Sequence, residues 1–118
     1  MLNLLLHPYS FRVMFFVCII VIEFLATTTI EIEVVSSMWD KANHFIAFFT
    51  LYILLHFAFR NLTIMSKVLF LLIFGLQIEI VQSFIDGRFF SLLDVVADSV
   101  GILLGVGSVY ILEKKLPQ

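Results

Sequence analysis

The chain alternates long apolar runs with short polar connections, and the pattern occurs four times. A helix needs about 20 apolar residues to cross the hydrocarbon core of a membrane. Runs of about this length cover residues 13–30, 42–59, 68–85 and 95–112. Lipid offers the backbone no hydrogen-bond partners, so spanning segments of this length must be helical. Short connections make sequential helices antiparallel neighbours. The pattern therefore predicts an all-α polytopic membrane protein, an antiparallel four-transmembrane-helix bundle forming one domain over residues 1–118.

The composition supports placing this chain in a membrane. Of its 118 residues, 62% are hydrophobic and 14% are charged, whereas a soluble domain carries roughly 25% charged residues. A soluble core of this size could not hide so much apolar surface. The small net charge of −2 and the lack of a basic run argue against nucleic acid as a partner.

The basic residues are distributed unequally between the two predicted sides. Cytoplasmic loops of membrane proteins carry an excess of lysine and arginine. We therefore expect the richer side to be cytoplasmic, which places both termini inside. That side carries Arg12, Arg60, Lys67, Lys114 and Lys115, and the other side carries Lys41 and Arg88.

Polar residues concentrate near one end of three predicted helices. They form three pairs, each about one helical turn apart and therefore on one helix face. In the predicted topology all of them lie on the extracytoplasmic side, with one arginine in a loop. An ionisable group inside lipid is costly, so such a cluster is by default a functional hypothesis. The residues are Asp40 and His44, Glu79 and Gln82, Asp94 and Asp98, and Arg88 in the last connecting loop.

Most of these residues also have a structural explanation. Asp40 and Asp94 could cap the helices that they begin. Glu79 and Gln82 could hydrogen-bond to neighbouring helices, as polar side chains in membrane bundles do. Arg88 could form an ion pair with a nearby aspartate. These explanations remain alternatives to a common site.

Helix capping does not explain Asp98, because this residue lies one turn inside its helix. Ala97, Gly101 and Gly105 lie on nearly the same side. Small residues at this spacing let another helix approach closely. We therefore expect this side of the helix to face the protein.

Familiar catalytic motifs are missing from the chain. It contains no H-E-x-x-H, P-loop, glycine-rich nucleotide fingerprint or G-x-S-x-G. Asp40 and His44 are the only helical pair with metal-ligand spacing, which is weak support for a metal. The sequence therefore predicts no cofactor and no metal.

Several short motifs together resemble the VanZ-like membrane protein family. The segment Asp40-Lys41-Ala42-Asn43-His44-Phe45 resembles the family's D-K-x-x-H-F. Glu79-x-x-Gln82 and Gly87-Arg88 are similar to its E-x-x-Q and G-R. Ser91-x-x-Asp94, with Asp98, Gly101 and Gly105, is similar to its S-x-x-D-x-x-x-N-x-x-G-x-x-x-G, except that Asp98 stands where the family usually has asparagine. The ordered set covers about residues 40 to 105.

The resemblance implies a small bacterial inner-membrane protein of the cell envelope. The family's founding member is associated with resistance to the glycopeptide antibiotic teicoplanin. We first expect a non-enzymatic protein whose polar site binds a membrane lipid headgroup, a lipid-linked cell-wall precursor or a lipophilic antibiotic. Arg88 would hold an anion, and Asp40, Gln82 and Asp98 would help to bind the ligand. A homo-oligomer would fit four helices that enclose only a small pocket.

The alternative is an enzyme acting on a lipid-linked phosphate or glycan. His44 would be the general base or nucleophile, and Glu79 a carboxylic acid that donates a proton. Asp94 would complete the catalytic set, and Arg88 would neutralise developing phosphoryl charge. A proton or ion path is a third reading, although the sequence offers little to continue it through the inner half.

Overall fold

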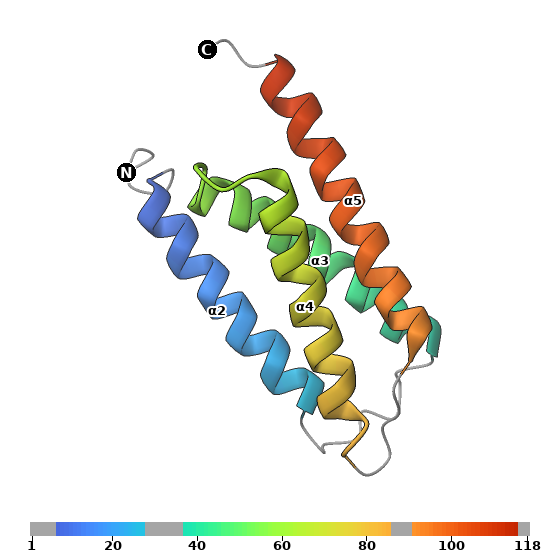
Figure 1. Ribbon diagram of the computed structural model, residues 1–118. Coiled ribbons are helices and arrows are strands. Elements are labelled where there is room, and N and C mark those ends of the chain that lie inside the picture. The colour runs from blue at the N-terminus through green and yellow to red at the C-terminus, as the bar shows by residue number, and fades with distance from the viewer. Residues whose placement is uncertain (1–6, 28–36, 86–90, 116–118) are drawn as a thin grey trace.

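Four helices in alternating directions make up the described part of the computed structural model, which covers residues 7–27, 37–85 and 91–115 (Figure 1). Neighbours in sequence run in opposite directions, so the starts of α3 and α5 lie at the same end as the finish of α4. The all-α class predicted from the sequence is confirmed. The helices are α2 (Pro8–Thr27), α3 (Ser37–Ala58), α4 (Ile64–Gln82) and α5 (Leu92–Lys115).

The length and hydropathy of these helices fit a membrane. Helices α2, α4 and α5 are each long and apolar enough to span it, and α3 contributes a shorter apolar stretch, Ala42–Ala58. Large apolar side chains such as Ile20, Ile73 and Leu103 are exposed on the outside of the bundle. These outer faces are apolar, as a surface in contact with lipid is. The protein is therefore a multi-pass membrane protein.

All four helices begin before the predicted apolar runs, whereas α2 and α4 end three residues before their runs do. Helix α4 begins at Ile64, where the Thr63 side chain accepts a hydrogen bond from the Ser66 backbone N–H at 3.1 Å. Helix α2 begins at Pro8, a residue favoured in a first helical turn. Helix α5 continues to Lys115, where lysine complements the negative end of the helix dipole.

Helices α3 and α5 pack closely because α5 presents glycine to α3. A Cβ atom on Gly101 would collide with the backbone carbonyl oxygen of Phe45 and lie 3.2 Å from the backbone nitrogen of Phe49. A Cβ on Gly105 would lie 2.9 Å from the Cβ of Tyr52. The small-residue side predicted for this helix therefore faces the protein.

An apolar core fills the middle of the bundle. Phe48 and Leu51 of α3 meet Leu71 of α4 and Ile102 of α5, and all four are almost fully buried. Phe15 of α2 belongs to the same cluster. This core separates the polar groups at the two ends of the bundle.

A network that the sequence analysis did not predict lies at the end where α4 begins. The Lys67 ammonium is 2.7 Å from Nδ1 of His56, and Nε2 of His56 is 2.6 Å from a carboxylate oxygen of Glu113. The ammonium also lies 5.6 Å from the centre of the Tyr52 ring. Lys67 is only 2% exposed. A lysine expected only to mark the cytoplasmic side thus joins three helices. We call Lys67, His56 and Glu113 the Lys67 network.

Adding a methyl group at Gly101 tests the α3–α5 contact. We expect Gly101→Ala to destabilise the protein by about 1–3 kcal/mol, because overpacking displaces backbone that cannot yield. Thermal unfolding in detergent measures the effect. Gly107→Ala is the matched control, because its Cβ would meet nothing within 4 Å. Equal melting temperatures for the two variants would contradict the packing described.

Removing the Lys67 ammonium tests the Lys67 network. We expect Lys67→Met to cost about 1–3 kcal/mol, because it leaves a polar atom of His56 without its donor while keeping the apolar stem. The matched control is Lys114→Met, since Lys114 is exposed at the same end. Unfolding in detergent should separate the two variants. Identical stability would show that the network contributes nothing.

Candidate functional site

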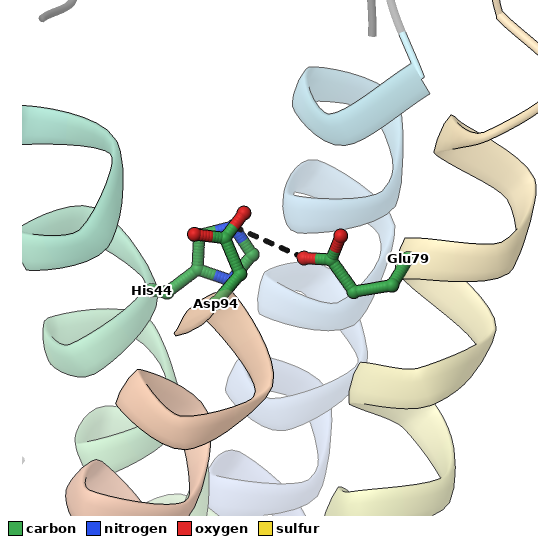
Figure 2. A group of neighbouring side chains, drawn as sticks. All are labelled: His44, Glu79 and Asp94. Atoms are coloured by element: carbon green, nitrogen blue, oxygen red, sulfur yellow. Dashed lines mark ion pairs between the residues drawn. The ribbon is translucent and has the colours of Figure 1, made fainter. Parts of the chain in front are cut away.

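Four ionisable side chains from three helices meet at the end of the bundle opposite the Lys67 network. His44 comes from α3, Glu79 from α4, and Asp94 and Asp98 from α5. Figure 2 shows three of them, His44, Glu79 and Asp94, pointing toward one another. The alternating helix directions bring together the N-terminal parts of α3 and α5 and the last turn of α4. We call these four residues the His44 cluster.

The shortest contact in the cluster joins His44 to Asp98. Nδ1 of His44 is 2.8 Å from Oδ1 of Asp98, which is 1% exposed. A carboxylate at this distance accepts the Nδ1–H of the ring. Gly75 of α4 makes room for this aspartate, because a Cβ at position 75 would lie 2.7 Å from Oδ2 of Asp98.

The second ring nitrogen of His44 faces two other carboxylates. Nε2 lies 3.5 Å from Oδ2 of Asp94 and 3.9 Å from Oε1 of Glu79. These separations exceed the roughly 2.9 Å typical of a nitrogen–oxygen hydrogen bond. They are ion-pair distances and are too long for good hydrogen bonds.

Glu79 is fixed by the start of α5. It is fully buried, and its Oε2 accepts a hydrogen bond from the Ser91 backbone N–H at 3.1 Å. Its Oε1 has no hydrogen-bond partner among the residues that the structure describes. Ser91 also accepts the Asp94 backbone N–H on its own hydroxyl at 3.3 Å. Ser91 thus positions both acids, a role that sequence reasoning missed although S-x-x-D resembles a helix-capping pattern.

The remaining residues predicted for the site lie elsewhere or outside the described part. Gln82 is buried, but its amide donates to the backbone carbonyl of Ala26 on α2 at 2.9 Å. Glu23 of α2 accepts a hydrogen bond from Gln77 of α4 at 2.7 Å. The side chain of Asp40 and the whole of Arg88 fall outside the described residues, so their predicted roles stay predictions.

The cluster is strongly acidic for so buried a place. Three nearly buried carboxylates surround a single imidazole. Burying charge in a medium of low polarity is costly unless the charge is paired. One atom each from His44, Glu79 and Asp94 lie within 4.8 Å of one another, an arrangement that could hold a metal ion. Spacing along the chain could not reveal this trio, since its members come from three helices.

The fold and the buried cluster define an all-α, multi-pass membrane protein with polar groups between its helices. The chain belongs to the VanZ/LLP1 family, whose profile matches residues 13–113. The resemblance drawn from the motifs is therefore confirmed. Searches of curated proteins and of solved structures gave no match.

The arrangement of basic residues predicts which side the His44 cluster faces. Arg12 donates from Nε to the carbonyl of Ala58 at 2.9 Å, which places Arg12 at the same end as the Lys67 network. Five of the seven basic residues therefore gather at one end, which we expect to be cytoplasmic. A C-terminal fluorescent-protein fusion should then fluoresce, and a C-terminal alkaline phosphatase fusion should be inactive. An active phosphatase fusion would reverse the orientation.

Proposed function

We propose that this protein is a membrane-embedded enzyme acting on a lipid-linked phosphate or glycan at the end where the His44 cluster lies. The 2.8 Å contact between His44 and Asp98 carries the proposal. A histidine oriented by a carboxylate, with its other nitrogen facing further reactive groups, is a recurring arrangement in catalysis.

Asp98 determines what His44 can do. By accepting the Nδ1–H, it places the electron pair of the neutral ring on Nε2. An electron pair there can take a proton from an attacking hydroxyl group, or it can bind a Lewis acid that activates that hydroxyl. Both routes generate a nucleophile between His44, Glu79 and Asp94.

The acids of the cluster complete the proposed chemistry. In the route without a Lewis acid, Glu79 in its protonated form would donate a proton to the leaving group, and its oxygen Oε1 lies on the side facing His44. Asp94 would orient the hydroxyl that attacks. Arg88 would neutralise developing phosphoryl charge from the loop between α4 and α5.

The nature of the bundle supports a substrate drawn from the membrane. The cluster lies between apolar helices, and their outer faces carry large exposed side chains such as Phe24 and Leu92 near the same end. A lipid tail can rest on such a surface while its polar head reaches the acids. The bacterial inner membrane is the proposed location.

The described side chains favour an enzyme over a simple receptor for anionic headgroups. A simple receptor has no need of an imidazole oriented by a carboxylate, whereas a general base does. In either function the grip on a phosphate would depend on Arg88, because three ionised carboxylates would repel it. Binding of a cell-wall precursor or a lipophilic glycopeptide, and any antibiotic resistance, therefore remain a second proposal. A homo-oligomer likewise remains a proposal.

Turnover of membrane lipids distinguishes the two functions. Purified protein in nanodiscs is incubated with a bacterial lipid extract, and lipid species are followed by mass spectrometry. An enzyme should consume one species and accumulate its product with time. We expect Glu79→Gln and His44→Asn each to lower the rate about 10²–10⁴-fold, as general acid–base groups do.

The matched control for these variants is His7→Asn, because His7 is exposed and lies outside the His44 cluster. Melting temperatures confirm that all variants are folded. A lipid retained by the protein but chemically unchanged would support binding instead. Full turnover in both cluster variants would disprove the proposed enzyme mechanism.

A further inference from the structure

The His44 cluster has the donors, the spacing and the buried charge of a metal centre. We propose that the side chains of His44, Glu79 and Asp94 bind a zinc ion through Nε2, Oε1 and Oδ2. This inference rests on the Lewis-acid route of the proposed function and names the ion that would activate the attacking hydroxyl. In that route His44, Glu79 and Asp94 serve as ligands, and they do not act as general base, general acid and positioning group.

The distances within the trio suit coordination better than hydrogen bonding. Zinc binds histidine nitrogen and carboxylate oxygen at about 2.0–2.2 Å, so two tetrahedral ligands lie about 3.4 Å apart. The Nε2 atom of His44 is 3.5 Å from Asp94 Oδ2 and 3.9 Å from Glu79 Oε1. With all three atoms within 4.8 Å, a point equidistant from them lies about 2.4 Å or less from each. A small contraction would bring them to bonding distance.

Glu79 supplies an independent reason to expect a ligand. This carboxylate is fully buried, and its Oε2 is occupied by the backbone N–H of Ser91. Its Oε1 has no hydrogen-bond partner in the described part of the chain, yet it faces Nε2 of His44. A buried carboxylate oxygen without a donor is costly. A cation between Glu79 and His44 would satisfy it.

The groups behind the ligands have the arrangement seen around metal centres. A metal-bound histidine usually donates its other N–H to a carboxylate, which fixes the ring and strengthens the ligand. Asp98 holds Nδ1 of His44 in this way at 2.8 Å. The Ser91 backbone N–H does the same for Glu79 at 3.1 Å. Both contacts aim the donor atoms at one point.

The burial of the acids in the cluster also fits a bound cation. Glu79, Asp94 and Asp98 are each no more than 3% exposed. A divalent ion would neutralise the two carboxylates that bind it, and zinc accepts both imidazole nitrogen and carboxylate oxygen as ligands. Three protein ligands leave a fourth position for water, whose acidity zinc increases enough to form hydroxide near neutral pH.

Metal content and metal binding test the proposal directly. The full-length protein is purified in detergent with a tag free of histidine, stripped with a chelator, and dialysed against micromolar zinc. Elemental analysis should find one zinc per chain. Cobalt substituted for zinc should give the visible absorption of a four- or five-coordinate ion with nitrogen and oxygen ligands.

Variants assign the ligands. His44→Ala, Glu79→Gln and Asp94→Asn should each abolish stoichiometric zinc binding, whereas Glu113→Gln, which alters a carboxylate at the other end, should retain it. Asp98→Asn should weaken binding about 10–100-fold, as loss of a supporting carboxylate does. Melting temperatures identify any variant that fails to fold. If a ligand variant is unfolded, the cobalt spectrum of the unaltered protein tests whether nitrogen and oxygen ligands bind the metal.

The outcomes separate this proposal from the proposed function. Zinc bound at the trio without lipid turnover would sustain the metal centre and overturn the enzyme. Turnover by a zinc-free protein that resists chelators would sustain the enzyme and overturn the metal centre. Absence of zinc binding, binding unaffected by the three ligand variants, or binding of magnesium or manganese in preference to zinc would each disprove the proposal.

Discussion

The close approach of α5 to α3 is the constraint on which the rest of the molecule depends. Gly101 and Gly105 remove the side chains that would hold these helices apart. As a result, α3 and α5 share a histidine–carboxylate contact at each end of their seam. His44 meets Asp98 at 2.8 Å, and His56 meets Glu113 at 2.6 Å. The two histidines are 12 residues apart, about 18 Å along the helix axis.

The same seam explains why the two polar ends are separate. Phe48, Leu51 and Ile102 fill the space between them with almost fully buried apolar side chains. The sequence suggested that a proton path would lack groups in its inner half, yet the Lys67 network lies there. The apolar core between the ends, and not a shortage of titratable groups, is what opposes such a path in this structure.

Much of the fold follows from patterns that are local along the chain. The apolar runs located the four helices, and the small residues of α5 identified its protein-facing side. Helix ends were less predictable, because they depend on side-chain contacts such as the one from Thr63 to Ser66. The single-domain organisation stays a prediction.

Four of the seven residues that the sequence predicted for the site lie together in the His44 cluster, but their pairing could not be predicted. His44, Glu79, Asp94 and Asp98 were selected because charge inside an apolar run needs an explanation. Their pairing could not be derived, since it depends on the separation and rotation of three helices. Gln82 shows the limit of the same reasoning. It shares a helix face with Glu79 closely enough to suggest a joint role, but its amide reaches Ala26 on α2.

Helix α4 gives the two ends of the bundle their different character. Both ends receive a histidine from α3 and a carboxylate from α5, but α4 adds Lys67 to one and Glu79 to the other. These two residues are buried at opposite ends of a single helix. Helix α4 therefore carries a lysine near one end and an acid near the other. A shift of α4 along its axis would change the surroundings of both histidines at once, because this one helix supplies a neighbour to each.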